Sequence, residues 1–118
     1  AYILIAFKSG QYSTCTGTLI DKKTILTAAH CLSDTASYEV YLGAQDITDY
    51  NSYETYKVSY AIKHPSYNDA NNLNDIALMI LEKEVTLTNT IQPACLPDYN
   101  EDLYPTSENI PAWIAGIN

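Results

Sequence analysis

The sequence predicts an all-β fold, either a sandwich or a small barrel. Five to seven short strand-like segments follow one another at close spacing, with polar or glycine-containing turns between them. No segment carries a convincing 3.6-residue apolar period, so no helix of more than one turn is expected. The chain has 118 residues, 47% of them hydrophobic, which is enough for the core of one domain.

Three strands are expected in the first quarter of the chain. Residues 2–7 form an apolar run, YILIAF. Residues 14–20 alternate small polar and apolar side chains, and residues 24–27 run back after the polar turn at 21–23. This pattern predicts an antiparallel hairpin. Residues 28–32 then predict a single helical turn.

The middle of the chain predicts three further strands. Residues 38–42 form the first of them, and residues 53–62 alternate polar and apolar side chains up to a His-Pro stop. A loop rich in Asn, Asp and Ser follows at residues 66–74. Residues 75–81, DIALMIL, are almost purely apolar and are therefore expected to form the most buried strand.

The last third of the chain is less regular. Residues 87–97 contain two prolines, and residues 98–111 form a polar connector. Residues 112–116 predict one last strand. No apolar stretch approaches membrane-spanning length, and the start AYILIAF has neither the basic segment nor the cleavage site of a signal peptide.

The charge balance excludes some partners. The net charge is −8 and the isoelectric point is near 4.4. Long-range repulsion therefore opposes binding to nucleic acid or to an anionic membrane surface. We expect neither as a partner, and the scattered acidic residues indicate a solvated surface.

The stretch TILTAAHC presents the first candidate for chemistry. His30 follows two small alanines and precedes Cys31. A histidine there can serve proton transfer, or it can simply bond a backbone carbonyl. Cys95 is the third cysteine of the chain, and an odd count in a secreted protein indicates either a bond that leaves the chain or a free thiol.

Asp75 is the second candidate, because it opens an otherwise apolar strand. An ionised carboxylate is costly to bury unless it is paired or hydrogen-bonded. An imidazole N–H is a natural partner, which the carboxylate would orient. Alternatively, Asp75 lies at an exposed strand start and caps a turn.

Four motifs, in order, are similar to segments of the chymotrypsin/trypsin-like serine proteases. They are CTGTLIDKKTILTAAHCL, NDIALMILEKEV, IQPACLP and PAWIAGIN. The resemblance implies an antiparallel Greek-key β-barrel, the first of the two barrels of a trypsin-like fold, with the second barrel missing. Residues 1–97 would then form this barrel, and residues 98–118 the crossover and the first strand towards the absent one.

The same resemblance implies roles for five residues. His30 would be the general base and acid, and Asp75 would hold its tautomer. Cys15 and Cys31 would form a disulfide beside the histidine. Cys95 would pair with a cysteine in a missing part, either a propeptide or the second barrel. A secreted, extracellular protein that acts on polypeptide substrates is implied.

The nucleophile of the family is not expected within this sequence. The family's serine lies in a Gly-Asp-Ser-Gly-Gly stretch, and none of the serines here has that setting. The chain should therefore be inert alone and should need the C-terminal half of the protease, from the same precursor or a second chain.

No cofactor and no metal are expected. The loop at residues 43–54 occupies the place where some relatives bind calcium between two glutamates. Here Ala44 and Gln45 fall near the first position and only Glu54 is near the second, which supplies too few oxygen ligands for calcium. A zinc site from His30, Cys15 and Cys31 lacks a fourth ligand.

Three functions stay open on these residues. The first is a trypsin-like serine endopeptidase represented by its N-terminal half. The second is a non-catalytic homologue that acts as a binding or regulatory module, although the presence of both His30 and Asp75 favours an enzyme. The third, a stand-alone structural β-domain, leaves Cys95 and the last strand without a partner.

Overall fold

The computed structural model of the protein describes residues 1–44, 46, 48, 49, 53–97 and 111–116. Within these residues the chain forms seven strands and one turn of 3₁₀ helix. In chain order they are β1 (Tyr2–Phe7), β2 (Tyr12–Thr16), β3 (Thr18–Leu19), β4 (Thr24–Thr27), η1 (Ala29–Cys31), β5 (Ala36–Leu42), β6 (Glu54–Lys63) and β7 (Ala77–Leu81).

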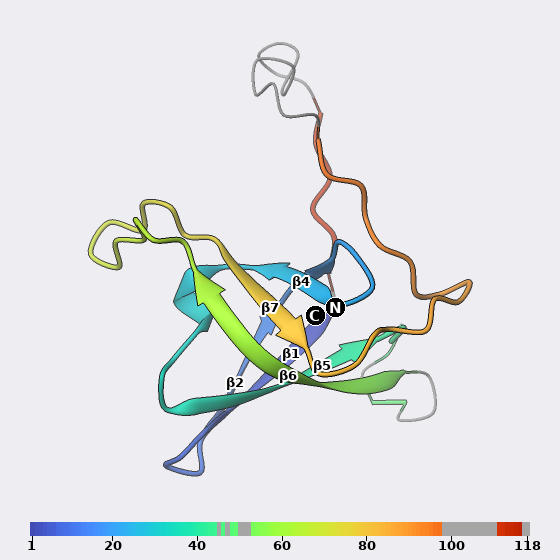
Figure 1. Cartoon of the computed structure of the whole chain (residues 1–118), viewed down its shortest axis with the longest axis horizontal. Coiled ribbons are helices and arrows are strands. Elements are labelled where there is room, and N and C mark those ends of the chain that lie inside the picture. Colours follow the sequence, from blue (N-terminus) through green and yellow to red (C-terminus); the bar gives the residue numbers. More distant parts are fainter. Residues whose placement is uncertain (45, 47, 50–52, 98–110, 117–118) are drawn as a thin grey trace.

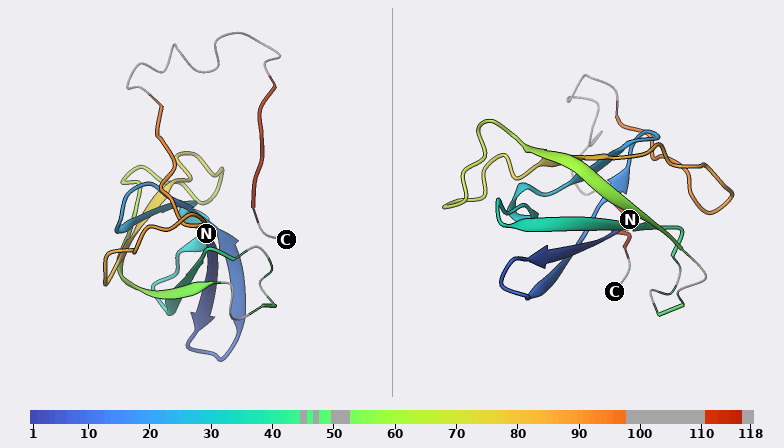
Figure 2. Two further views of the ribbon diagram at one scale, coloured as in Figure 1. Left: turned by 90° about the vertical axis from the view of Figure 1, so that its right-hand side faces the viewer. Right: turned by 60° about the horizontal axis from the view of Figure 1, so that its bottom comes forward.

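The strands pair antiparallel in the order β2-β1-β5-β6-β7-β4-β3. The two edge strands of this order, β2 and β3, are consecutive in the chain and only Gly17 separates them. The sheet must therefore curl until its two edges meet, and the result is a nearly closed barrel (Figure 1). The curl is also visible in Figure 2, where β6, in light green, crosses the barrel in the right-hand view.

Gly17 makes this closure possible. A Cβ atom at this position would lie 2.5 Å from Cγ2 of Ile25 and 2.9 Å from Cδ1 of Ile3. Both side chains belong to the core and have no exposed surface, so neither can move aside without opening a void. The absence of a side chain at Gly17 is what allows the backbone to pass this close to the core.

The core fills the barrel through the period-2 alternation of its strands. In β1 the side chains of Ile3 and Ile5 point inward, and in β7 Met79 and Leu81 do the same. The core cluster comprises Ile3, Ile5, Leu19, Ile25, Cys31, Val40, Leu42, Met79, Leu81, Val85 and Ile91. Its members come from β1, β3, β4, β5 and β7, from η1 and from the chain after β7, so the barrel has one continuous core.

The structure confirms the all-β prediction and corrects some element boundaries. The strand expected at residues 75–81 begins only at Ala77, which leaves Asp75 and Ile76 just before it. The strand expected at 14–20 is divided at Gly17 into β2 and β3, since the chain passes there from one edge of the sheet to the other.

The strand expected at residues 112–116 is not formed. Residues 111–116 have no regular secondary structure and pair with none of the seven strands. This segment returns towards the barrel and ends near the N-terminus (Figures 1 and 2). The polar connector expected at 98–111 lies, up to residue 110, outside the described residues.

No helix in the described part of the chain is long and apolar enough to cross a membrane.

Candidate active site

The register of β4 on β7 brings His30 and Asp75 together. Thr27, the last residue of β4, pairs with Ala77, the first residue of β7. Because the strands are antiparallel, the chain beyond Thr27 and the chain before Ala77 leave the sheet at the same end. His30 lies three residues after Thr27 and Asp75 two residues before Ala77, so the two side chains meet despite a sequence separation of 45.

Two hydrogen bonds join His30 to Asp75. The ring nitrogen Nδ1 of His30 lies 2.6 Å from Oδ2 of Asp75, and the backbone N–H of His30 donates to Oδ1 at 2.8 Å. Both carboxylate oxygens are thus used by one residue, which fixes the ring relative to its own backbone. The side chain of Asp75 is 21% exposed and that of His30 is 59% exposed, so the imidazole remains open to a reaction partner.

The charge state of Asp75 follows from these contacts. The hydrogen bond from the His30 ring, supported by the backbone N–H groups of His30 and Ala29, lowers the pKa of Asp75 below its usual value of 3.8. At neutral pH the carboxylate is ionised and can only accept hydrogen bonds. Nδ1 of His30 therefore carries the donated proton, and Nε2 of a neutral ring is left as an acceptor. Such a ring can take up a proton at Nε2 while the carboxylate stabilises the resulting cation.

A disulfide bond joins the turn that carries His30 (η1, called the histidine turn below) to β2. Cys15 at the end of β2 and Cys31 in η1 are joined, with their Cα atoms 6.3 Å apart. The bond that the resemblance implies is therefore present. It also removes the thiolates that a zinc site would need, although Cys15, His30 and Cys31 do lie within 4.8 Å of one another through their ligand atoms.

The remaining candidates lie apart from this pair. Cys95 is an exposed free cysteine. The carboxylate of Glu54 accepts a hydrogen bond from the hydroxyl of Tyr56 at 2.6 Å. Near the first expected calcium position, Ala44 has no side-chain ligand atom and Gln45 lies outside the described residues. His64, the second histidine of the chain, accepts the backbone N–H of Ser66 at Nδ1 and so fastens a turn.

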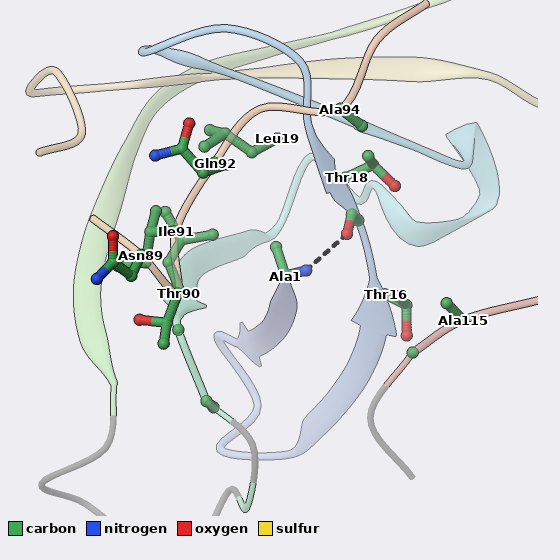
Figure 3. A pocket seen from close by; sticks show the side chains of 15 residues that line it. Ala1, Thr16, Thr18, Leu19, Asn89, Thr90, Ile91, Gln92, Ala94 and Ala115 are labelled. Atoms are coloured by element: carbon green, nitrogen blue, oxygen red, sulfur yellow. Dashed lines mark hydrogen bonds between the residues drawn. The ribbon is translucent and has the colours of Figure 1, made fainter. Parts of the chain in front are cut away.

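A cavity of about 450 Å³ opens on another face, beside the N-terminus. Figure 3 shows Ala1 at its centre, where its amine donates to the carbonyl of Gly17 at 2.8 Å. Thr16, Thr90 and Ile91 line it together with Ala115 of the last segment. His30 and Asp75 are not among its lining residues, so this cavity is separate from the candidate active site.

Sequence reasoning missed Thr27, whose hydroxyl donates to the carbonyl of Thr16 at 3.0 Å. The signal was present in TILT, since a strand that points Ile25 into the core must also point Thr27 inward. A hydroxyl on the core face of a strand requires a partner inside the protein. The alternation could therefore have identified this residue, but not the carbonyl that it bonds.

Comparisons with known proteins agree with this architecture. The sequence model of the Trypsin family, described as "Trypsin", matches residues 2–117. The chain is 36% identical over 120 residues to chymotrypsin-like elastase family member 1 of Bos taurus, an alignment that covers 97% of this chain and 44% of the relative.

Solved structures give the same result. The structure of GrC superposes with a TM-score of 0.74 at 34% identity, over 84% of this chain and 44% of that one. The structure of HL collagenase superposes with a TM-score of 0.70 at 36% identity, over 81% of this chain and 41% of the other.

The antiparallel barrel that presents a histidine and an aspartate at one end is thus one barrel of the trypsin fold. The chain belongs to the trypsin family of serine proteases. It spans less than half the length of these relatives.

Proposed function

We propose that this chain is the N-terminal half of a secreted trypsin-like serine endopeptidase. The observation that carries the proposal is the 2.6 Å contact between Nδ1 of His30 and Oδ2 of Asp75. In the proposed reaction Nε2 of His30 takes the proton of a serine hydroxyl as that hydroxyl attacks a peptide carbonyl. The same nitrogen then returns the proton to the leaving amine, while Asp75 holds the tautomer and stabilises the cation.

The serine is contributed from outside these 118 residues in this proposal, because none of the serines here stands in a Gly-Asp-Ser-Gly-Gly stretch. Residues 1–97 are then the first barrel, and residues 98–118 lead to the second. The exposure of two apolar side chains supports this division. The side chains of Trp113 and Ile114 are almost fully exposed, although both are apolar, and a second barrel would cover them.

The proposed partner of the chain is therefore the C-terminal half of the protease, and the proposed substrate is a polypeptide. Cys95 supports a covalent link to the missing part, because its exposed thiol is free for a cysteine outside the chain. A secreted protein agrees with the disulfide between Cys15 and Cys31, since such bonds persist in oxidising surroundings.

Hydrolysis of casein by the purified full-length protein tests the proposal. The two histidines of the chain provide a matched pair of variants. We expect His30→Ala to lose nearly all activity, since it removes the general base, and His64→Ala to keep the wild-type rate, since this ring only fastens an exposed turn. Equal activity in all three proteins would contradict the role of His30. A folded wild-type protein with no activity would instead identify a non-catalytic homologue.

A further inference from the structure

Thr27 occupies an unusual position in the barrel. It is the one buried polar residue among those that the structure describes, with 7% of its surface exposed. It is the last residue of β4, and only Ala28 and Ala29 separate it from His30. Valine has nearly the same shape and would fill this place without a polar atom, so the hydroxyl needs an explanation of its own.

The partner of the hydroxyl is the backbone carbonyl of Thr16, at 3.0 Å. Ala1 and Gly17 exchange both of their backbone hydrogen bonds. The adjacent pair Tyr2 and Thr16 is therefore a pair without hydrogen bonds, and the carbonyl of Thr16 points away from β1. Because β2 is an edge strand, no neighbouring strand donates a backbone N–H to this carbonyl. The hydroxyl of Thr27 donates to it instead.

The bond to Thr16 and the disulfide hold the segment that carries His30 at both of its ends. Thr27 is hydrogen-bonded to Thr16, and Cys31 is joined to Cys15 by the disulfide. The short segment that carries His30 is thus attached at both of its ends to two adjacent residues of β2. On its other side, the backbone of Thr27 pairs with Ala77 in β7, two residues beyond Asp75.

We propose that Thr27 is a positioning residue for His30: its hydroxyl bond to Thr16 sets where the histidine turn leaves β4, and so holds the ring on Asp75. The effect on the rate rests on the proposed protease function, whereas the effect on the contact between His30 and Asp75 does not. Misplacing a catalytic group by about 1 Å can reduce a rate by about 100-fold, so a partial loosening of the turn should still be measurable.

Three variants of the full-length protein test this role. Thr27→Val keeps the shape and removes the hydroxyl. Thr27→Ser keeps the hydroxyl and removes a methyl group. Ile25→Val removes one methyl group from a fully buried residue of the same strand, without touching the bond to Thr16. It controls for a general loss of stability in β4.

Two readouts are needed. The first is kcat and KM for a peptide substrate, well below the melting temperature of each variant. We expect Thr27→Val to lower kcat about tenfold with KM within about twofold, because the catalytic group and not the substrate site is displaced. Thr27→Ser and Ile25→Val should keep kcat within about twofold of the wild type.

The second readout is the NMR signal of the Nδ1 proton of His30 in nitrogen-labelled protein, which reports its hydrogen bond to Asp75 even if the protein hydrolyses nothing. This signal should broaden or move upfield in Thr27→Val and stay unchanged in the other two variants. An unchanged signal in Thr27→Val overturns the proposal, whether or not the wild type is a protease. So does an equal loss of kcat in Ile25→Val, or in Thr27→Ser.

Discussion

The histidine turn and the last described segment of the chain are opposites in how their positions are determined. The turn around His30 is fixed on every side from within the chain, by a disulfide, a threonine hydroxyl and an aspartate that binds both the ring and the backbone. Residues 111–116 have no strand pairing, and Trp113 within them is 97% exposed.

This contrast shows which part of the site the chain can build alone. The geometry of His30 and Asp75 depends on the register of β4 and β7, and both strands are inside this barrel. The side chain of Trp113, by contrast, is covered by none of the described residues. The internally supported pair of His30 and Asp75, together with the uncovered apolar segment, is what the proposed N-terminal half of a two-barrel protease would show.

The largest expected effect comes from Asp75→Asn, which removes the carboxylate that holds the ring and the backbone of His30. An amide in place of the carboxylate favours the wrong tautomer of His30 and cannot stabilise its cation. If the full-length protein is the proposed protease, we expect its kcat to fall by about 10⁴-fold, the effect of the equivalent substitution in trypsin-like enzymes. Asp21→Asn, which removes the same charge from a distant turn, should leave kcat unchanged. A loss below tenfold for Asp75→Asn would contradict the assigned role.

Removal of the disulfide should have the next largest effect. The bond between Cys15 and Cys31 spans 16 residues, and a loop of that length stabilises the folded state by about 3 kcal/mol in the chain-entropy estimate. We expect Cys15→Ser/Cys31→Ser to lower the free energy of unfolding by about that amount in denaturant titrations. A double variant that unfolds at the wild-type midpoint would show that the turn does not need this support.

Trp113→Ser tests whether the last described segment is covered by another part of the full-length protein. If the second half of the protein covers this side chain, the substitution should destabilise the full-length protein by about 2 kcal/mol, the usual contribution of a large buried apolar residue. Tyr60→Thr is the control, because Tyr60 is also exposed in this structure and lies on β6 of the barrel. Changes within about 0.5 kcal/mol for both variants would mean that Trp113 stays in solvent.

The smallest effect is a dependence of stability on pH. The pKa of Asp75 is lower in the folded chain than its usual 3.8, chiefly through the hydrogen bond from His30. The resulting stabilisation is complete above the unfolded pKa and is lost as the pH falls through the folded one. The melting temperatures of the wild type and Asp75→Asn should therefore converge in acid. A constant difference down to the lowest pH at which both fold would contradict this linkage.

The sequence predicted the strands well where an apolar run or a regular alternation of polar and apolar side chains marked them. Residues 2–7 form β1 as expected, and the long alternating strand at 53–62 is shifted by only one residue in β6. The expectation failed at 112–116, since an apolar segment of strand-like composition still needs a neighbouring backbone.

The site was predictable in its residue types but not in its geometry. TAAHC and DIAL identify His30 and Asp75 through their resemblance to a family, whereas their contact depends on the pairing of Thr27 with Ala77 across the barrel. Nothing local in either motif specifies that register. The carbonyl of Thr16 became a partner for Thr27 only because the two edges of the sheet meet at Gly17.

The most direct test of the account is covalent labelling of the full-length protein with a fluorophosphonate, followed by peptide mapping. If His30 and Asp75 activate a serine outside these residues, one serine beyond residues 1–118 will be labelled, and the label will be lost in His30→Ala. A labelled serine within residues 1–118, or equal labelling of the wild type and His30→Ala, would contradict the account.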